Sequence, residues 1–312
     1  MHASPEMKSA WTQYWKSGQS GSLPEDRAAG RLGALDAAWK VFFESLPQQS
    51  TIVDLATGGG DVIRAARAAA RDFEITGVDI ADLSSVNAQL PGVRLVGNTD
   101  LSSLPFGDAA FDGVMSQFGI EYAEVAASTR EAMRVLKPGG RGLFVLHHTD
   151  SVVTRWAVNS LAAYRTVFPD DSAIRMATAV LETRKRTAPP AVIMEADAEL
   201  RREVSILQSR LRNEHAFGLA RNVVTFLAAL AKAPGLHPPA QGLRMLDSAK
   251  EQIQTNTLRQ QAQVDAAMDG EKMEKFVALL RAAGAAVGPP DELKYPNGMN
   301  LAWKCSFHKP TG

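Results

Sequence analysis

The sequence predicts an α/β fold, in which a doubly wound, mostly parallel sheet carries helices on both faces and a helical insertion. Three observations support this prediction. Residues 51–148 alternate between strand and helix patterns, which is typical of a parallel sheet. Residues 149–283 contain no convincing strand pattern and are expected to be a run of helices. The segment LAWKCSFHK, at residues 301–309, returns to a strand pattern.

The stretch Thr51–Gly60, with the sequence TIVDLATGGG, organises the first part of this alternation. Its first residues are mostly apolar and suit a strand that is buried on both faces. Glycines end the stretch, and a helical pattern begins at Asp61. This order brings backbone N–H groups close to a ligand at the carboxyl end of a parallel sheet. Asp54 lies inside the strand, where burial without a partner is costly, so it indicates a cationic or hydrogen-bonding ligand.

Seven segments are expected to form the sheet. The first five strands are expected at Thr51–Ala56, Glu74–Asp79, Val93–Gly97, Phe111–Ser116 and Gly142–His147. Helices are expected near Asp61–Arg71, Leu83–Gln89 and Ala123–Leu136. A segment around Ala286–Tyr295 can pair with the strand at 301–309, although Pro289 and Pro290 confine it to an edge.

The chain is expected to have four parts. These are an N-terminal helical cap at residues 1–50, a core at 51–148, a helical insertion at 149–270, and a C-terminal helix and strand pair at 271–312 that completes the core. In the cap, Trp11, Tyr14 and Trp15 lie at helical spacing. We interpret them as packing against the main domain, with a lid over the ligand cleft as the alternative.

Composition excludes several classes of protein. The chain has 312 residues with 34 basic and 34 acidic side chains, and this balance argues against a general nucleic-acid-binding protein. The single cysteine, Cys305, allows no intramolecular disulfide and argues against a cysteine-based zinc site. Neither a membrane span nor a signal peptide is apparent, so we expect a cytoplasmic protein. We also expect a monomer or a homodimer.

Four motifs follow one another within residues 50–148. They are DLATGGG at Asp54–Gly60, Val78-Asp79, DLSSLPF at Asp100–Phe106 followed by Phe111-Asp112, and LKPGG at Leu136–Gly140. In this order they resemble the motifs of the class I S-adenosylmethionine-dependent methyltransferases, in the UbiE-like branch of that family. Ala56 stands where a glycine is common in the family. The resemblance implies a Rossmann-like methyltransferase fold with a seven-stranded sheet and S-adenosyl-L-methionine as cofactor.

The resemblance also implies a set of cofactor-binding residues. They are Asp54, Ala56, Gly58, Gly60, Asp79, Ile80, Asp100, Leu101, Ser116 and Gln117. The glycines allow close backbone approach, and Asp54 is expected to hold the ammonium group of the cofactor. Asp79 is expected to accept hydrogen bonds from the ribose hydroxyls, and Asp100 from the adenine amino group. The alternatives are that Asp79 caps the following loop and that Asp100 forms an Asx turn.

A nicotinamide-dependent dehydrogenase is the competing interpretation. That family needs the pattern G-x-G-x-x-G, but Ile63 stands where the third glycine or alanine belongs. An acid inside the first strand, as at Asp54, also fits that family poorly. The motifs therefore favour the methyltransferase.

Candidate catalytic residues follow the fourth and fifth strands, at the edge of the sheet where ligands bind in this kind of fold. His148, His147 and Glu121 have the chemistry of a general base, which is needed when the acceptor must lose a proton. For each histidine, a cap or a satisfied loop residue is the alternative. No metal site is expected, because the adjacent histidines diverge on an extended segment.

The expected function is transfer of a methyl group to an oxygen, nitrogen or carbon atom of a small molecule. We expect the insertion to select a partly apolar acceptor, because it carries Trp156, Tyr164, Phe168 and Phe217. The zero net charge disfavours a nucleic-acid partner. The alternatives are an RNA or protein methyltransferase and a cofactor-binding protein without methylating activity.

Overall fold

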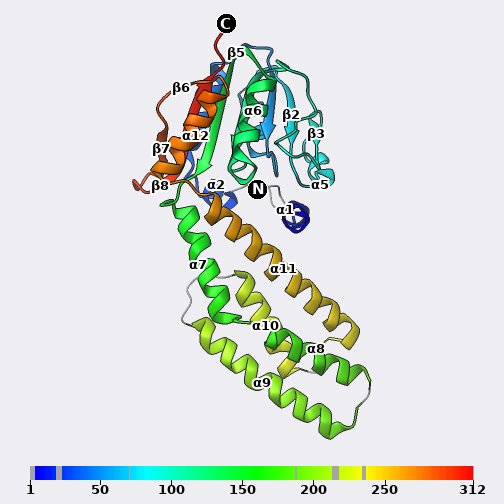
Figure 1. The fold of residues 1–312 in the computed structure, drawn as a ribbon. Coiled ribbons are helices and arrows are strands. Elements are labelled where there is room, and N and C mark those ends of the chain that lie inside the picture. Colours follow the sequence, from blue (N-terminus) through cyan, green and yellow to red (C-terminus); the bar gives the residue numbers. More distant parts are fainter. Residues whose placement is uncertain are drawn as a thin grey trace. The chain divides into compact units, whose positions relative to one another are not determined.

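The computed structural model describes residues 4–18, 23–69, 71–186, 188–212, 218–233 and 237–311. The chain divides into two compact units (Figure 1). The first unit comprises Met1–Arg155 and Ala262–Gly312, and the second is Trp156–Gln261. The first contains the sheet and the second consists of helices, so the predicted α/β fold with a helical insertion is confirmed.

The sheet of the first unit is doubly wound. Its strands are β1 (Thr51–Leu55), β2 (Glu74–Val78), β3 (Arg94–Val96), β4 (Phe111–Gln117), β5 (Leu136–His147), β6 (Ala286–Val287), β7 (Asp291–Lys294) and β8 (Asn300–His308). Their order is β3-β2-β1-β4-β5-β8-β6, with β7 also paired to β8. The first five strands are parallel, and β8 is antiparallel to all three of its partners. Strand order reverses between β1 and β4, where a ligand crevice is expected at the carboxyl ends.

The sheet has eight strands, so the prediction of seven was wrong. The expected edge strand at 286–295 is split into β6 and β7, and both pieces pair with β8. Pro289 and Pro290 lie between the two pieces. Proline has no N–H to donate to a ladder, which explains why the pairing is interrupted there.

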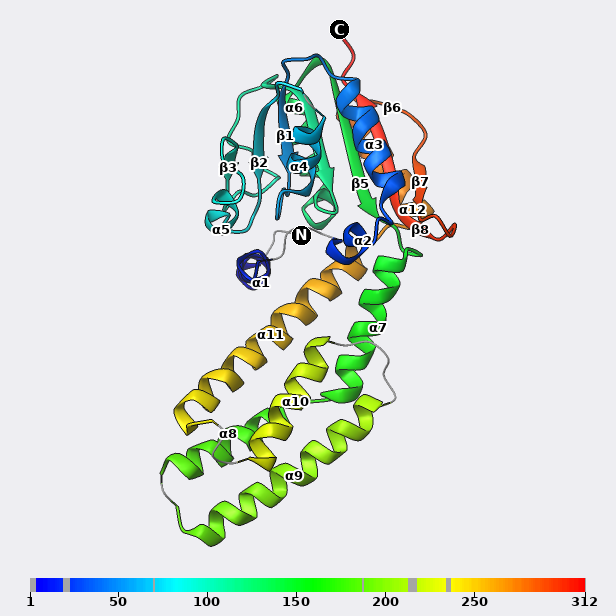
Figure 2. The same ribbon diagram turned by 180° about the vertical axis from the view of Figure 1, so that it is seen from behind.

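Helices cover both faces of the sheet. One face carries α3 (Gly33–Glu44), α4 (Asp61–Ala68) and α5 (Ser84–Asn87), seen in front in Figure 2. The other carries α6 (Val125–Val135) and α12 (Gly270–Ala282), seen in front in Figure 1. The remaining helices of this unit are α1 (Pro5–Lys16), α2 (Pro24–Ala28) and the 3-10 turn η1 (Ile120–Tyr122). The start of α4 agrees with the sequence prediction, but α4 and α5 end earlier than expected.

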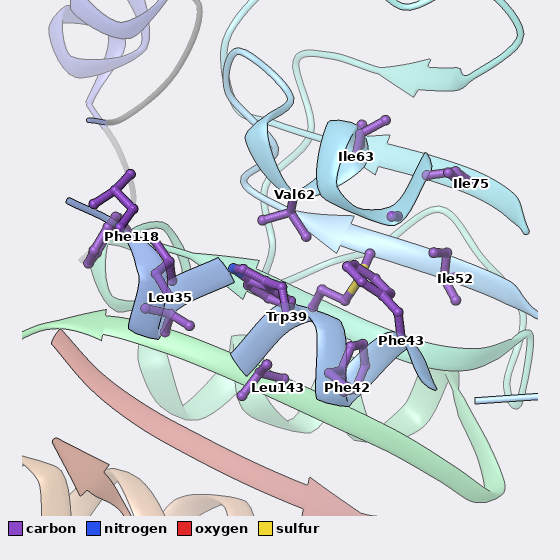
Figure 3. Packing of buried hydrophobic residues seen from close by; sticks show 14 of the residues in the cluster. Leu35, Trp39, Phe42, Phe43, Ile52, Val62, Ile63, Ile75, Phe118 and Leu143 are labelled. Atoms are coloured by element: carbon purple, nitrogen blue, oxygen red, sulfur yellow. The ribbon is translucent and has the colours of Figure 1, made fainter. Parts of the chain in front are cut away.

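Aromatic residues of α3 anchor that helix on the sheet. Trp39 and Phe43 are buried one helical turn apart, and their rings are stacked at a centroid distance of 5.8 Å. Figure 3 shows them packed over Ile52 of β1 and Leu143 of β5. The indole Nε1 of Trp39 also donates a hydrogen bond of 2.7 Å to Gln117 Oε1, at the carboxyl end of β4. This helix therefore supports the end of the sheet where a ligand is expected.

Strand β5 begins six residues earlier than the sequence predicts. The expected helix through Leu136 ends at Val135, and Leu136 already pairs with Phe111 of β4. The LKPGG segment is not a free turn before the strand, because the Gly139 amide donates to the Lys309 carbonyl. The C-terminal segment thus recruits these residues into extended structure, a long-range effect that local pattern does not reveal.

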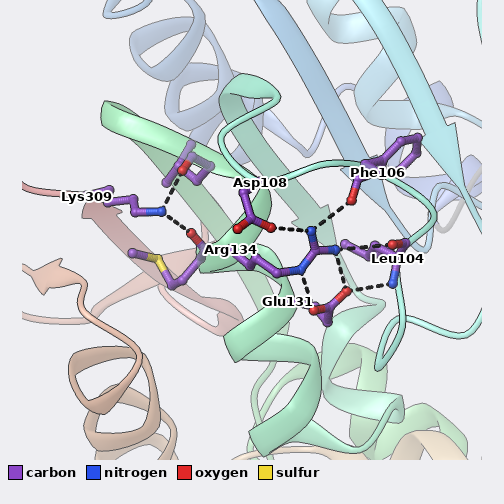
Figure 4. Close-up of polar contacts among 8 residues, drawn as sticks. Leu104, Phe106, Asp108, Glu131, Arg134 and Lys309 are labelled. Carbon is purple, nitrogen blue, oxygen red and sulfur yellow. Dashed lines mark hydrogen bonds and ion pairs between the residues drawn. The ribbon is translucent and has the colours of Figure 1, made fainter.

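The connection between β3 and β4 contains no helix in residues 97–110. Arg134 of α6 holds it in place, as Figure 4 shows. Its guanidinium donates to the carbonyls of Phe106, at 2.8 Å, and Leu104, at 3.2 Å. The same group pairs with Asp108 at 2.9 Å and with Glu131 at 2.7 Å. These partners raise the pKa of Arg134, so its charge is permanent.

The second unit has its own hydrophobic core. Its helices are α7 (Val152–Val167, which begins in the first unit), α8 (Ser172–Lys185), α9 (Pro190–Arg212), α10 (Gly218–Lys232) and α11 (Pro239–Ala266, which ends in the first unit). Leu181, Leu200 and Leu227 are fully buried in this core. Trp156 is exposed, whereas Tyr164 is buried. Phe217 lies outside the described residues.

Within the described part of the chain, we find no helix with the length and apolar character needed to cross a membrane.

Replacing Arg134 with Gln is expected to lower the free energy of unfolding by about 1–3 kcal/mol, because two loop carbonyls lose a charged donor. Urea unfolding followed by circular dichroism measures this change. Arg130→Gln is the matched control, because Arg130 is exposed on the same helix. It should change the value by no more than about 0.5 kcal/mol. Equal losses in both variants would show that the network contributes nothing of its own.

Candidate functional site

The turn between β1 and α4 is shaped by left-handed residues. Gly58 and Gly60 have φ angles of +50° and +83°, in the region that side chains disfavour. Neither position has room for a side chain. An added Cβ would lie 2.3 Å from Trp15 Cζ2 at Gly58 and 2.4 Å from Leu90 Cδ1 at Gly60. The glycines therefore allow close approach to the backbone, and in this structure Trp15 makes that approach at Gly58.

Ala56 has a φ of +56°, which explains why a glycine suits this position. An alanine in the left-handed region costs about 1–2 kcal/mol relative to its preferred conformations. The departure from the family pattern thus leaves the path of the chain unchanged and places strain at the end of β1.

Asp54 is a buried carboxylate with one unsatisfied oxygen. Asp54 belongs to β1 and is 1% exposed. Oδ2 accepts a hydrogen bond of 2.7 Å from the hydroxyl of Thr57, whereas Oδ1 has no partner. Burial raises the pKa of Asp54 to about 7, although the Thr57 hydroxyl opposes the shift. A buried acceptor without a donor indicates that a ligand group belongs beside it.

Asp79, directly after β2, is bonded to the backbone through both oxygens. Oδ2 accepts from the Gly58 amide and Oδ1 from the Ala81 amide, each at 2.8 Å. Burial raises the pKa of Asp79, and these hydrogen bonds oppose the rise. The capping role considered as an alternative is therefore present. The next residue, Ile80, is half-buried.

Asp100 and Leu101 lie after β3. Asp100 Oδ1 accepts from the amide of Ser102 at 2.9 Å and from its hydroxyl at 2.8 Å, which is an Asx turn. Leu101 is buried in the core cluster on the α6 face of the sheet. The Thr99 amide donates to the Asp79 carbonyl, so this loop is tied to the end of β2.

A small cavity of about 30 Å³ lies at the glycine turn. It is lined by Trp15, Asp54, Ala56, Thr57, Gly58, Asp61, Val62, Gln117 and Phe118. Its volume is roughly that of one or two water molecules. Trp15 of α1 is 7% exposed and packs in the core cluster as well as over the turn. The N-terminal aromatic residues thus pack against the main domain, and Trp15 also covers the glycine turn.

Helix α1 is attached to the loop after β2. Lys16 pairs with Asp82 at 3.0 Å, and the Asp82 amide donates to the Thr12 hydroxyl at 3.0 Å. A hydrogen bond from the Ser84 amide, together with Lys16, lowers the pKa of Asp82 to about 2. Both contacts hold Trp15 over the glycine turn.

Glu121 and His147 form a buried pair. Nδ1 of His147 lies 2.8 Å from Glu121 Oε1, and the His147 amide donates to the same oxygen at 2.9 Å. The side chains are 6% and 0% exposed, and Glu121 Oε2 has no partner. The imidazole lies 4.4 Å from the ring of Phe118, which lines the cavity at the glycine turn. The structure therefore brings this pair beside the cleft.

His148 lies in a different environment. Its Nδ1 accepts from the Asp150 amide at 2.9 Å, and its Nε2 lies 3.4 Å from a carboxylate oxygen of Glu292. The ring stacks on Trp303 of β8 at a centroid distance of 4.7 Å. Both ring nitrogens have partners, which agrees with the alternative of a satisfied structural histidine.

Ser116 and Gln117 connect the site to the strands. The Ser116 hydroxyl donates to the Leu55 carbonyl at 2.8 Å and accepts from the Ile120 amide at 3.0 Å. The side-chain oxygen Oε1 of Gln117 accepts the hydrogen bond from Trp39, and Gln117 lines the cavity. Ser116 is thus a support for the turn after β4.

The sequence pattern predicts no individual site role for Thr57 or Phe118, and it favours packing over a lid for Trp15. Thr57 follows Asp54 by three residues. This spacing suits a local hydrogen bond between the two side chains and can be recognised in the sequence. Phe118 has a φ of +53°, a strained value that no residue pattern announces. Among the described residues, no three histidine, cysteine, aspartate or glutamate side chains are grouped to hold a metal ion.

The chain is similar to known methyltransferases over part of its length. The model of a family described as "Methyltransferase domain" matches residues 53–144. A ubiquinone/menaquinone biosynthesis C-methyltransferase UbiE of Methylobacterium nodulans is 34% identical over 124 residues, which are 36% of this chain and 49% of that protein. A demethylmenaquinone methyltransferase of Thermus thermophilus is 38% identical over 118 residues, 36% of this chain and 50% of that protein. The chain thus spans about half the length of the curated relatives it matches.

Solved structures give weaker similarities. The 1,6-didemethyltoxoflavin-N1-methyltransferase of Burkholderia thailandensis has 11% identity and a TM-score of 0.47, with 98% of this chain and 88% of that one covered. The putative methyltransferase bound to the Trm112 activator of Haloferax volcanii has 25% identity and a TM-score of 0.38, with 44% and 60% covered. These similarities are too low to carry a conclusion about this chain.

Replacing Ala56 with Gly is expected to raise the free energy of unfolding by about 0.5–1 kcal/mol. Relief of the left-handed strain exceeds the greater entropy of glycine in the unfolded chain. Gly60→Ala is the matched opposite change and should lower stability, because its Cβ meets Leu90. Urea unfolding measures both. A loss of stability in Ala56→Gly would contradict the strain at this position.

Proposed function

We propose that this chain, in which residues 53–144 form a class I S-adenosylmethionine-dependent methyltransferase domain, moves a methyl group from S-adenosyl-L-methionine to a small-molecule acceptor. The observation that carries the proposal is the buried, unpartnered Oδ1 of Asp54 beside a left-handed glycine turn. That oxygen is a ready acceptor for a ligand ammonium group, and the glycines admit a ligand to the backbone.

The residues at the strand ends fit the cofactor. Asp54 holds the ammonium group. Asp79 and Asp100 already accept backbone hydrogen bonds, but each carboxylate oxygen has a second lone pair. Those lone pairs accept the ribose hydroxyls at Asp79 and the adenine amino group at Asp100. The backbone bonds fix the orientation of both carboxylates before the cofactor arrives, which lowers the entropy cost of binding.

Trp15 must leave Gly58 when the cofactor binds. The cavity at the turn has room for one or two water molecules, and the indole occupies the approach to the glycine backbone. Helix α1 is held there by Lys16 and Thr12, both on exposed or half-buried positions. Surface ion pairs of this kind contribute about 1 kcal/mol or less, so the main cost of displacing α1 is the loss of the buried contacts of Trp15.

His147 is the proposed general base. When bound, S-adenosylmethionine supplies a methyl group that its sulfonium activates for in-line displacement. Glu121 accepts a hydrogen bond from the Nδ1–H of His147, which leaves Nε2 free to take a proton from the acceptor. The buried setting of the pair keeps water away from the imidazole. His148 is assigned a structural role, because both of its ring nitrogens are engaged.

The acceptor is proposed to be a small, partly apolar molecule that the helical insertion selects. Val192, Met194 and Ile206 of α9 are exposed apolar residues in that insertion. One curated relative is named a C-methyltransferase of ubiquinone/menaquinone biosynthesis and the other a demethylmenaquinone methyltransferase, and a carbon acceptor must lose a proton to a base. These relatives match about a third of this chain, so their acceptor is a guide to the experiment only. Quinols are the first group of acceptors to test.

Calorimetric titration with S-adenosylhomocysteine tests the cofactor. Binding is expected, and it should weaken about tenfold for each pH unit below 7. The ligand ammonium pairs with ionised Asp54, and below its pKa of about 7 the carboxyl is protonated and must first release the proton. Asp54→Asn should bind more weakly at pH 8 and show no such pH dependence.

NAD serves as the contrasting ligand in the same titration, and no binding is expected. Binding of NAD without binding of S-adenosylhomocysteine would refute the methyltransferase assignment. Equal pH dependence in wild type and Asp54→Asn would place the titrating group elsewhere.

Substitution of the two histidines separates their roles. Turnover is measured with methyl-labelled S-adenosylmethionine and a panel of quinols, phenols and amines. His147→Gln is expected to reduce kcat about 100- to 10,000-fold, because the base is lost, while the affinity for S-adenosylhomocysteine stays within twofold. His148→Gln, the neighbouring control, should keep kcat within about threefold when folded material is compared.

The reverse order, with His148→Gln inactive and His147→Gln active, would overturn the assignment of the base. Cofactor binding without turnover on any acceptor of the panel would favour a cofactor-binding protein without methylating activity.

A further inference from the structure

A second cavity, of about 330 Å³, lies at the amino ends of the parallel strands. Residues at or next to the starts of β1, β2, β3 and β4 line it, among them Thr51, Glu74, Arg94 and Phe111. The glycine turn follows the carboxyl end of β1, at the other edge of the sheet. This cavity is therefore separate from the proposed cofactor cleft, and it is much the larger of the two.

The cavity exists because one face of the sheet lacks a helix there. α6 and α12 pack on that face over β4, β5 and β8, as Figure 1 shows, whereas the β3–β4 connection has no helix. Alternation along β2 puts Glu74 and Thr76 on the face of Val78, which belongs to the α6-side core. The loop at Pro105, Phe106 and Gly107 forms the wall of the cavity opposite these polar residues of β2. Arg134 anchors that loop (Figure 4).

Two opposite charges on the cavity wall have no ion-pair partner among the described residues. Arg94 lies over the ring of Phe106, with 5.6 Å between its guanidinium carbon and the ring centroid. Glu74 has no ion pair or side-chain hydrogen bond in the same part of the chain. The neighbouring charges are paired, since Lys137 contacts Asp112 at 2.9 Å. An arginine stacked by one face keeps its N–H edge available for a carboxylate.

Thr76 adds a hydroxyl group to the same wall. The residue is 4% exposed, and within the described ranges its hydroxyl makes no hydrogen bond. The hydroxyl is not among the fully buried atoms that lack a partner, so it is open to the cavity. Its position between Glu74 on its own strand and Arg94, its register partner on β3, places a free donor and acceptor between the two charges.

We propose that this cavity binds a free amino acid with an apolar or aromatic side chain. Arg94 takes the carboxylate, Glu74 takes the ammonium group, and Thr76 hydrogen-bonds between them. The rings of Phe106 and Phe111, whose centroids are 5.0 Å apart, receive the apolar side chain. The proposal concerns a site away from the cofactor cleft and does not depend on the methyltransferase assignment.

The dimensions agree with this class of ligand. Glu74 and Arg94 stand on adjacent strands with a two-residue offset, so their Cα atoms are roughly 8 Å apart. The described residues show no ion pair between these two side chains, so a zwitterion can take a hydrogen bond or ion pair from each of them. The cavity volume lies at the lower end of the range of about 300–1,000 Å³ for small-molecule sites.

Binding of L-phenylalanine to the full chain tests the proposal by calorimetry or saturation-transfer NMR. Saturable binding is expected, and saturating S-adenosylhomocysteine should leave it unchanged. Arg94→Gln and, separately, Glu74→Gln should each weaken it at least tenfold. Both side chains are on exposed residues, so the variants should retain the wild-type thermal unfolding midpoint. Arg130→Gln, which changes an exposed arginine on α6, is the control and should bind as wild type does.

Two analogues test the zwitterion. 3-Phenylpropionate lacks the ammonium group, phenethylamine lacks the carboxylate, and each should bind at least tenfold more weakly than L-phenylalanine. The proposal is overturned by an absence of saturable binding, by undiminished binding in Arg94→Gln, by equal binding of either analogue, or by competition from S-adenosylhomocysteine. The last result would place the amino acid in the cofactor cleft.

Discussion

The hydrogen bond from the Gly58 amide to the Asp79 carboxylate joins the two strand ends on which the candidate site is built. It gives a partner to a backbone donor near the start of α4 and to a buried acid at the same time. Because Asp79 is also held by the Ala81 amide, the carboxylate cannot turn away without leaving two buried donors unsatisfied. The ends of β1 and β2 are thus locked at a fixed separation.

Asp54 shows the opposite solution to the same problem. It is as buried as Asp79, yet one of its oxygens has no donor, and its pKa rises to about 7. One acid has a backbone donor for each of its oxygens, whereas the other keeps an unpaired acceptor buried at a cost to the fold. A buried acid with one unpaired oxygen therefore indicates a ligand position more directly than its place in a strand does.

Local pattern predicts the parallel strands, the glycine turn and the helices on both faces, because each depends on neighbouring residues. It does not predict partners that are distant in the chain. His147 and His148 are adjacent, but one meets Glu121 and the other meets Glu292 and Trp303. The side chains of successive strand residues point to opposite faces, and the sequence does not show which partners lie on each face. The cavity beside Arg94 likewise depends on a loop that is distant in the chain from β2.

The position of Trp15 over Gly58 makes the chain its own competitor for the cleft. Uptake of a ligand there is then an exchange, in which an indole returns to water or to a new contact as the ligand enters. The apparent affinity equals the intrinsic affinity multiplied by the fraction of molecules with the indole displaced. Each factor of ten in that fraction corresponds to about 1.4 kcal/mol. Small changes in the attachment of α1, far smaller than those needed to remake the cleft, are therefore enough to tune occupancy across a wide range of ligand concentration.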